Sequence, residues 1–214
     1  MKPINTRAYR NHILLGDCVD AMRRMPSGIV DMALTDPPYI ANYRPRSGDV
    51  VANDRSREWL RPSFAELYRV LKRDAFCISF YGWPKTDLFM SAWKSAGFRI
   101  GGHFVFCKRY GSSKGFVKYS HEAAYLLVKG KPPLPSEPLD DIREWVYTGN
   151  TLHPTQKSIH ILKPLIESFS KPGDLVLDPF AGSGSTLKAA ALSGRDYLGI
   201  ELEEQHYKTC VERL

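Results

Sequence analysis

The run Val30-Asp31-Met32-Ala33-Leu34-Thr35 leads directly into Asp36-Pro37-Pro38-Tyr39. The short apolar run predicts a buried strand. The two prolines fix the backbone angle φ at successive positions and remove two backbone donors, so they predict a stiff corner at the strand end. The corner presents a carboxylate and the Pro37 carbonyl, which can accept both hydrogens of an amino group, and a tyrosine ring that can stack on a heterocycle. The pattern indicates a site for a planar amino-heterocycle; the alternative is a strand-ending turn capped by Asp36.

A second stretch, residues 175–190, predicts a strand, a glycine-rich turn and an alanine-rich helix. Gly182 and Gly184 let backbone N–H groups approach a ligand closely at the positive end of the helix. Residues 197–201 then predict another strand, which ends in the carboxylate of Glu201. An acid at the end of the next strand of a doubly wound sheet suits the two hydroxyls of a ribose.

Together, Asp-Pro-Pro-Tyr at 36–39 and Phe-x-Gly-x-Gly at 180–184 resemble the S-adenosylmethionine-dependent amino methyltransferases of DNA. The Pro-Pro motif comes first here, and His153-Pro154-Thr155-Gln156-Lys157 precedes the glycine turn, an order similar to the β class of adenine-N6 and cytosine-N4 enzymes. The resemblance implies a circularly permuted class I (Rossmann-like) α/β fold. Its seven-stranded sheet would be mostly parallel with one antiparallel strand, in a single domain of residues 1–214. Ser158 departs from the family pattern, which usually has proline after the lysine.

The resemblance also implies S-adenosyl-L-methionine as the cofactor. Asp17, which the local pattern predicts as a helix N-cap, would lie with Cys18 beside the adenine, and Glu201 would hold the ribose. Thr155 and Lys157 would meet the carboxylate of the methionine part. The expected cofactor residues are Asp17, Cys18, Asp36, His153, Thr155, Lys157, Asp178, Phe180, Ala181, Gly182, Ser183, Gly184, Ser185, Thr186 and Glu201. The expected catalytic residues are Asp36, Pro37, Pro38 and Tyr39.

The expected reaction depends on positioning, because the lone pair of an aromatic amine is spread into its ring. Accepting the two amine hydrogens at Asp36 and the Pro37 carbonyl would localise that pair toward the methyl donor, without a metal. A base in duplex DNA must leave the stack to reach the corner. Aspartate at the first motif position favours adenine N6. Cytosine-N4 methylation, RNA adenine methylation and a non-catalytic nucleic-acid-binding role remain the alternatives.

Composition agrees with a nucleic-acid partner. The 214 residues carry a formal net charge of +7 and the pI is about 9.2, which favours a polyanion such as double-stranded DNA. The sequence has no apolar run of membrane-spanning length, and its four cysteines show no Cys-x-x-Cys spacing. We therefore expect a cytoplasmic protein without a metal site or disulfide. The family resemblance leaves open a monomer or a homodimer, and a cognate restriction endonuclease.

Three basic or irregular segments, residues 41–61, 108–118 and 129–150, are candidate DNA-contacting loops; the alternative for each is a solvated surface. Neither of the last two resembles a helix that enters the major groove, so we expect a site of about four base pairs or fewer, or none beyond the adenine itself. The candidate DNA-binding residues are Arg44, Arg46, Arg55, Arg57, Lys108, Arg109, Lys114 and Lys118.

Between these loops the sequence predicts further elements of the sheet. Residues 63–71 predict a helix with a capping box from Ser63 to Glu66. Residues 98–108 and 121–128 predict the two strands of an antiparallel hairpin.

Overall fold

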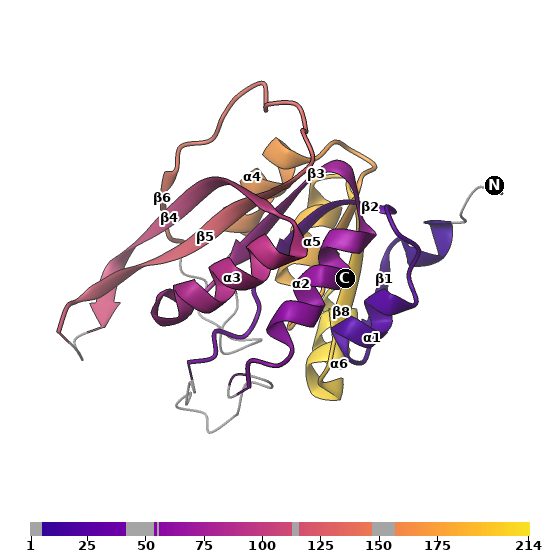
Figure 1. Cartoon of the computed structure of the whole chain (residues 1–214), viewed down its shortest axis with the longest axis horizontal. Helices are drawn as coiled ribbons and strands as arrows, with labels where there is room; N and C mark the ends of the chain where they lie inside the picture. The colour runs from indigo at the N-terminus through magenta and orange to yellow at the C-terminus, as the bar shows by residue number, and fades with distance from the viewer. Residues whose placement is uncertain (1–5, 42–53, 55, 113–115, 147–156) are drawn as a thin grey trace.

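A single sheet organises the computed structural model, which describes residues 6–41, 54, 56–112, 116–146 and 157–214. Within these residues the sheet has eight strands in the order β1-β8-β7-β2-β3-β5-β4-β6 (Figure 1). The strands are β1 (His12–Leu15), β2 (Val30–Thr35), β3 (Leu71–Phe80), β4 (Arg99–Ser112), β5 (Tyr119–Lys129), β6 (Ile142–Glu144), β7 (Leu175–Asp178) and β8 (Asp196–Glu201).

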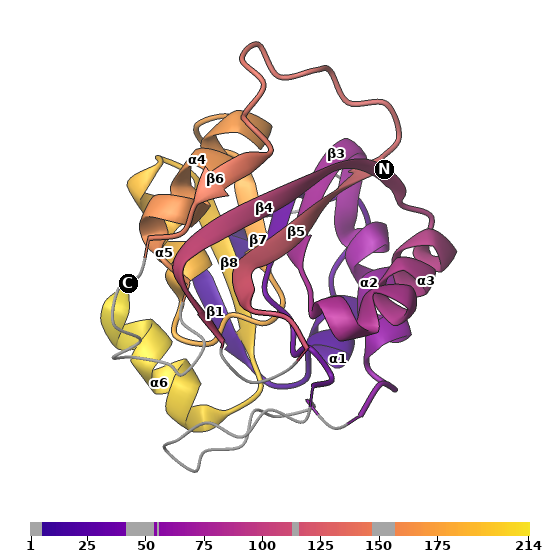
Figure 2. The same ribbon diagram turned by 90° about the vertical axis from the view of Figure 1, so that its left-hand side faces the viewer.

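Helices cover both faces of the sheet (Figure 2). The α-helices are α1 (Cys18–Arg23), α2 (Leu60–Val70), α3 (Thr86–Ala96), α4 (Ile159–Phe169), α5 (Ser185–Leu192) and α6 (Glu204–Arg213), and the 3-10 helices are η1 (Thr6–Tyr9) and η2 (Trp83–Lys85). The first three α-helices pack on one face, where Phe64 and Trp93 are fully buried, and α4 and α5 pack on the other, where Leu165 and Ile166 are. Helix α6 joins the second face through Cys210 against Leu187.

The strand order places a topological switch between β7 and β2. From β7 the chain continues to β8 on one side, and from β2 it continues to β3 on the other. All five strands from β1 to β3 in this order are parallel, and β5 alone runs antiparallel to its neighbours. Ligands of open parallel sheets bind at the carboxyl ends of the strands at such a switch.

The predicted fold class is confirmed, with one correction to the number of strands. Seven strands were expected, and the eighth is β6, which pairs parallel with β4 from Val105 to Cys107. It lies within the proline-rich stretch 129–150, where the sequence predicts only an irregular loop. Three residues of edge strand are too short to produce a readable alternation of apolar and polar side chains.

Two local predictions can be compared at the starts of helices. Asp17 caps α1 as expected, because its carboxylate accepts from Val19 N–H at 2.8 Å and Asp20 N–H at 3.1 Å. The capping box at Ser63 is wrong: α2 begins at Leu60, and the Ser63 hydroxyl donates back to the Leu60 carbonyl at 3.1 Å.

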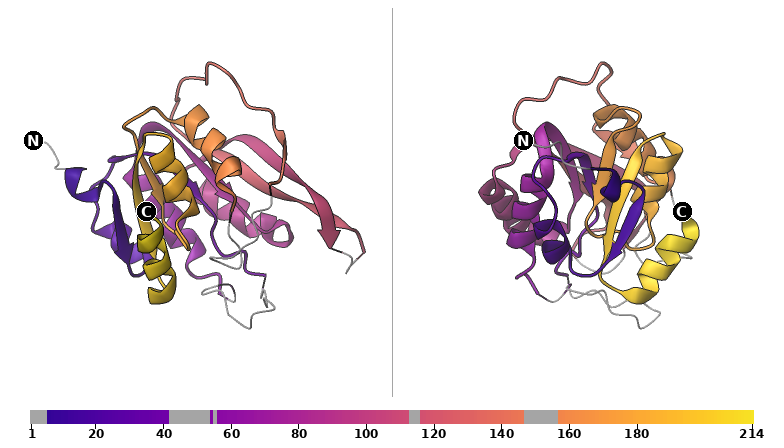
Figure 3. Two further views of the ribbon diagram at one scale, coloured as in Figure 1. Left: turned by 180° about the vertical axis from the view of Figure 1, so that it is seen from behind. Right: turned by 90° about the vertical axis from the view of Figure 1, so that its right-hand side faces the viewer.

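The predicted hairpin is confirmed and is longer than expected. Strand β4 continues to Ser112 and β5 begins at Tyr119, so only part of the expected loop 108–118 lies outside the two strands. Seen from behind, the hairpin projects beyond the body of the molecule (Figure 3).

None of the described helices is long and apolar enough to cross a membrane.

Candidate active site

The carboxyl ends of four neighbouring parallel strands bring the expected site residues together. Asp17 follows β1, Asp36 follows β2, and Asp178 and Glu201 end β7 and β8. The Gly16 N–H donates to the Glu201 carbonyl at 2.8 Å, which ties the end of β1 to the end of β8. The acidic residues of both sequence motifs therefore meet at one edge of the sheet, on either side of the topological switch.

The glycine turn after β7 has the open geometry expected of it. Gly182 and Gly184 have φ values of 52° and 77°, in the left-handed region that residues other than glycine rarely adopt. Gly184 is the N-cap of α5 and has no side-chain cap. A Cβ on Gly184 would lie 2.6 Å from the Cys210 sulfur, so the turn packs directly on α6. The amino-terminal end of α5 therefore has no side-chain cap on its first backbone N–H groups.

Helix α6 braces this turn from behind. The Arg213 guanidinium donates to the Ser183 carbonyl at 3.1 Å and to the Ser185 hydroxyl at 2.9 Å. The Ala181 N–H donates to the Ile200 carbonyl at 2.9 Å, which fastens the turn to β8. These contacts hold the glycine turn in one position before any ligand binds.

Glu201 lies where the ribose-binding acid is expected. It is buried, and its two carboxylate oxygens accept from Gly182 N–H at 2.7 Å and Glu203 N–H at 2.8 Å. Each oxygen keeps a further lone pair for a hydroxyl donor. Burial raises the pKa of the Cys18 thiol to about 12, and the charges of Asp17 and Glu201 contribute, so Cys18 lies close to both acids.

Asp178 is a buried carboxyl with an unusual titration. Burial raises its pKa to about 7, although hydrogen bonds from the Thr186 side chain and the Phe180 N–H lower it. The Phe180 N–H lies 3.1 Å from Asp178 Oδ1. The Phe180 ring packs edge-on against Trp59, with centroids 5.1 Å apart. The carboxyl group of Asp178 could pair with a cationic group of a bound ligand.

S-adenosylmethionine fits these residues. Its ribose hydroxyls would meet the spare acceptors of Glu201, its ammonium would meet Asp178, and its adenine would lie near Asp17 and Cys18. The uncapped start of α5 lets the methionine part approach the backbone. His153 and Thr155, the other expected cofactor residues, lie outside the described residues.

The Asp36 corner is more tightly partnered than the sequence indicates. The Tyr39 hydroxyl donates to Asp36 Oδ1 at 2.7 Å, and the Lys157 ammonium forms an ion pair with Asp36 Oδ2. Lys157 was expected at the cofactor carboxylate; in the structure its nitrogen contacts Asp36 and lies 3.3 Å from the Tyr39 oxygen. Pro37 is buried, and none of the described residues donates to its carbonyl.

Burial changes the titration of both polar groups at the corner. It raises the pKa of the Asp36 carboxyl, an effect that the Lys157 ammonium and the Tyr39 hydrogen bond oppose. It also raises the pKa of the Tyr39 hydroxyl, and the Asp36 charge adds to that shift. Tyr39 is therefore a neutral hydrogen-bond donor, and the Lys157 ammonium favours the ionised form of Asp36.

Three further residues surround the corner and were not predicted from the sequence. Gly82 packs so closely that a Cβ on it would lie 2.7 Å from the Tyr39 Cβ. Glu122 lies on β5 and forms an ion pair with Lys108 at 2.5 Å. Trp145, beyond β6, has the Lys108 nitrogen 5.1 Å from its ring centroid. No local motif marks these residues, because strand pairing and not sequence proximity brings them to the corner.

The candidate DNA-binding residues fall into different environments. Arg57 and Lys118 are exposed, and Arg109 is exposed but pairs with Glu144 at 2.6 Å. The Lys108 side chain is 17% exposed and paired with Glu122, so it is turned toward the corner and not toward solvent. Arg44, Arg46, Arg55 and Lys114 lie outside the described residues.

Known proteins share both the sequence and the fold. The family model described as "DNA methylase" (N6_N4_Mtase) matches residues 30–212. A putative methylase of Escherichia coli K12, YubD, is 53% identical over 95% of this chain and 90% of its own length. The DNA adenine methyltransferase YhdJ of the same organism is 30% identical over 94% of this chain and 82% of its own length.

The fold also matches a solved structure, that of a putative DNA modification methylase from Thermus thermophilus complexed with S-adenosyl-L-methionine. Its TM-score is 0.76 at 22% identity, over 95% of this chain and 92% of that one. The sequence motifs, the permuted strand order and the family match agree. The chain belongs to the S-adenosylmethionine-dependent N6/N4 DNA methylase family.

Proposed function

We propose that this protein transfers a methyl group from S-adenosyl-L-methionine to the N6 amino group of adenine in double-stranded DNA. The observation that carries the proposal is the Asp36 corner at the end of β2. There the half-buried Asp36 carboxyl group, paired with Lys157, and the buried Pro37 carbonyl lie beside the cofactor residues of β7 and β8. Such a corner suits an amine with two hydrogens to donate.

The expected roles of the chain's own residues follow from this geometry. Asp36 and the Pro37 carbonyl accept the two amine hydrogens and so direct the nitrogen lone pair away from its ring. Tyr39, anchored through its hydroxyl, forms one wall of the base site. The cofactor, when bound, supplies an electrophilic methyl group on its sulfonium. Alignment of two bound reactants contributes several kcal/mol to catalysis, on the order of 7 or more in well-oriented cases.

Adenine is favoured over cytosine by two observations. Asp36 occupies the first position of the motif, as in the adenine subset that the sequence resembles. YhdJ, which is named as a DNA adenine methyltransferase, is similar over 94% of this chain. Cytosine-N4 methylation is the second candidate, because the matching family model covers both amino groups.

DNA binding is proposed for exposed cations of the loop before α2 and of the β4–β5 hairpin tip. The net charge of +7 and the exposed side chains of Arg57 and Lys118 support contacts to phosphates. Phosphate contacts position a protein without reading sequence, so the proposal includes a relaxed or short recognition site of about four base pairs.

Product analysis tests the proposal directly. Purified protein is incubated with isotopically labelled S-adenosylmethionine and either plasmid DNA or RNA, and the nucleosides are separated after digestion. We expect labelled N6-methyldeoxyadenosine from DNA, and at least about 30-fold less of it with the Asp36→Ala variant. Labelled N4-methyldeoxycytidine, or labelling of RNA alone, would replace the proposal. Sequencing of the methylated plasmid would contradict relaxed recognition if a strict motif of about six base pairs emerged.

A further inference from the structure

Lys157 occupies a closed position at the Asp36 corner. Its side chain is 8% exposed, and its ammonium contacts the carboxylate of Asp36. Three aromatic rings surround the nitrogen, with centroids 5.5 Å away for Tyr39, 5.0 Å for Phe80 and 5.8 Å for Trp145. Ring faces attract a cation, most strongly when it is desolvated. The ammonium is therefore held in place from several sides, and not at the end of a mobile surface chain.

None of the other charged groups near the corner, among the described residues, competes with Asp36 for the Lys157 ammonium. Glu122 on β5 approaches Tyr39 and Asp36, but it has its own cation in Lys108 at 2.5 Å. The charge of Asp36 contributes to the raised pKa of Asp178 on β7. Among the described residues, no cation forms a salt bridge with Asp178. Among the described salt bridges, Lys157 is thus the cation that compensates Asp36.

Compensation matters because of what Asp36 has to do. A buried carboxyl tends to take up a proton, and burial indeed raises the pKa of Asp36. A protonated carboxyl offers a donor where the target amine needs an acceptor. In its ionised form Asp36 has about four lone-pair sites, of which Tyr39 and Lys157 use one each. The remaining sites can accept from an amino group while Lys157 stays in place.

We propose that Lys157 is a positioning residue of the methylation reaction, which keeps Asp36 ionised and aimed at the target amino group. This inference rests on the proposed methyl transfer to an exocyclic amine, and it holds for adenine or cytosine. It differs from a role at the cofactor carboxylate, where the sequence motif places this lysine. The ammonium lies between the Asp36 carboxylate and three aromatic rings. None of these groups belongs to the glycine turn or to Glu201, so we assign Lys157 to the site of the target nucleobase.

The test compares Lys157→Met, which removes the charge and keeps the stem over the rings, with Lys157→Arg, which keeps the charge. For Lys157→Met we expect an unchanged cofactor dissociation constant, within about twofold, and a methyl-transfer rate at neutral pH that is at least about tenfold lower. The acid limb of its rate–pH profile should move to higher pH, because Asp36 without its cation holds a proton longer. Lys157→Arg should restore part of the rate and of the acid limb.

Two outcomes would overturn the inference. A cofactor dissociation constant raised about tenfold, with the acid limb unmoved, would return Lys157 to the cofactor carboxylate. An unchanged rate and profile would deny it any role at Asp36. Wild-type protein measured in parallel separates this from the proposed function, which fails if the wild type itself transfers no methyl group to DNA.

A second measurement does not depend on activity. Carbon-13 NMR of labelled aspartate follows the titration of Asp36, assigned by its loss in Asp36→Asn. We expect the Asp36 transition at higher pH in Lys157→Met than in wild type, and an identical transition would contradict the inference. If Lys157→Met melts early, the double variant with Asp36→Asn should recover the melting temperature, because neither charge is then buried alone. A double variant that melts as early as Lys157→Met would also contradict it.

Discussion

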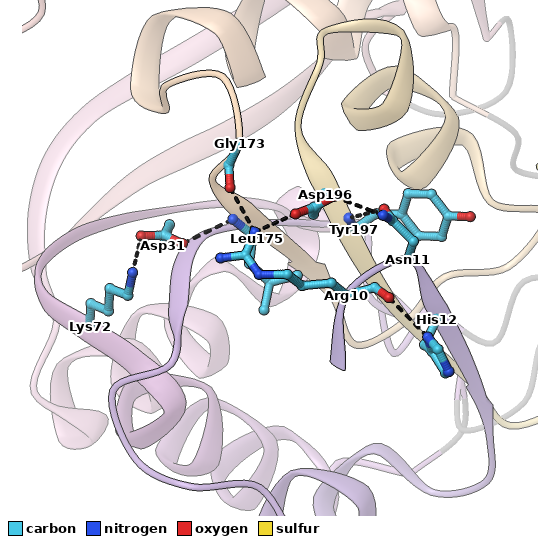
Figure 4. Close-up of polar contacts among 9 residues, drawn as sticks. All are labelled: Arg10, Asn11, His12, Asp31, Lys72, Gly173, Leu175, Asp196 and Tyr197. Carbon is cyan, nitrogen blue, oxygen red and sulfur yellow. Dashed lines mark hydrogen bonds and ion pairs between the residues drawn. The ribbon is translucent and has the colours of Figure 1, made fainter. Parts of the chain in front are cut away.

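The two ends of the same parallel strands carry acids of different character. At the amino ends, Asp31 accepts from Lys72 at 2.5 Å and from Leu175 N–H at 2.9 Å, and Asp196 accepts from Asn11 at 2.7 Å and pairs with Arg10 (Figure 4). These acids link the starts of β2, β3, β7 and β8 to one another and to the segment before β1. The partners of both acids are side chains and a backbone N–H of the chain itself, so the acids at the amino ends of the strands have a structural role.

At the carboxyl ends the acids are held with capacity to spare. Glu201 accepts two backbone N–H groups, Asp36 has two partners, and Asp178 has the Phe180 N–H and the Thr186 side chain. Burial raises the pKa of both Asp36 and Asp178. An acid at the end of a strand therefore indicates function when it is desolvated and still has lone pairs without a donor, and not simply because it is present.

Removing one acid from each edge should separate the two roles most strongly. Asp36→Ala should lower methyl transfer at least about 30-fold, since loss of an aligned charged acceptor costs roughly 2 kcal/mol or more, while cofactor binding stays near wild type. The matched variant Asp31→Ala should keep the turnover number and lose about 1–2 kcal/mol of unfolding free energy, because the Leu175 N–H loses its acceptor. Single-turnover assays and urea denaturation check both. Retention of more than about a tenth of the wild-type rate by Asp36→Ala would disprove its catalytic role.

Two glycines offer a second pair. Gly184 and Gly173 both have positive φ, 77° and 82°, so alanine is strained at each. Only at Gly184 does the added Cβ meet an atom, the Cys210 sulfur at 2.6 Å; at Gly173 the space is open. Calorimetry should show a cofactor affinity at least about tenfold lower for Gly184→Ala, and unchanged affinity for Gly173→Ala. Equal affinities in two folded variants would place the cofactor away from the glycine turn.

Surface cations give a third comparison. Replacing Arg57 and Lys118 by alanine should weaken DNA binding and reduce the magnitude of the negative slope of log K against log salt by about 0.9 for each lost phosphate contact. Arg10 and Lys72, which are ion-paired at the opposite edge, form the matched control pair and should leave the slope unchanged. An unaltered slope in the first variant would show that Arg57 and Lys118 do not contact DNA.

A fourth comparison concerns pH. Asp178 has a native pKa of about 7, above its ordinary value of 3.8, so the folded protein holds a proton that the unfolded chain releases. Stability should therefore fall as pH rises from about 4 to about 7, and remain lowered above that. Cofactor affinity should rise a few-fold between about pH 6 and 8, as the carboxylate that pairs with the cofactor ammonium forms.

Asp178→Asn should remove both pH dependences, and Asp196→Asn at the other end of the neighbouring strand should keep them. Thermal melts and calorimetry across this pH range measure the two effects. Persistence of both dependences in Asp178→Asn would assign the titration to another group.

Local motifs were read correctly where neighbouring residues decide the structure. The Asp17 cap, the corner at Asp36-Pro37-Pro38-Tyr39 and the turn with Gly182 and Gly184 each depend on dihedral preferences and hydrogen bonds within a few residues. The Ser63 capping box was wrong because tertiary packing decided where the helix begins. A serine three residues before a glutamate fits the pattern, but Leu60 and Trp59 are buried, and their packing starts the helix earlier.

The fold class and the family could be predicted from the sequence because the short motifs and their order resemble a known family, and the acids at the strand ends because they follow short apolar runs. How those acids are used depends on the tertiary structure. Lys157 lies 121 positions from Asp36, and Glu122 reaches the corner through the pairing of β5 with β3. Which cation faces which carboxylate, and how much water each keeps, depends on packing between distant segments, and that packing sets the charge on Asp36.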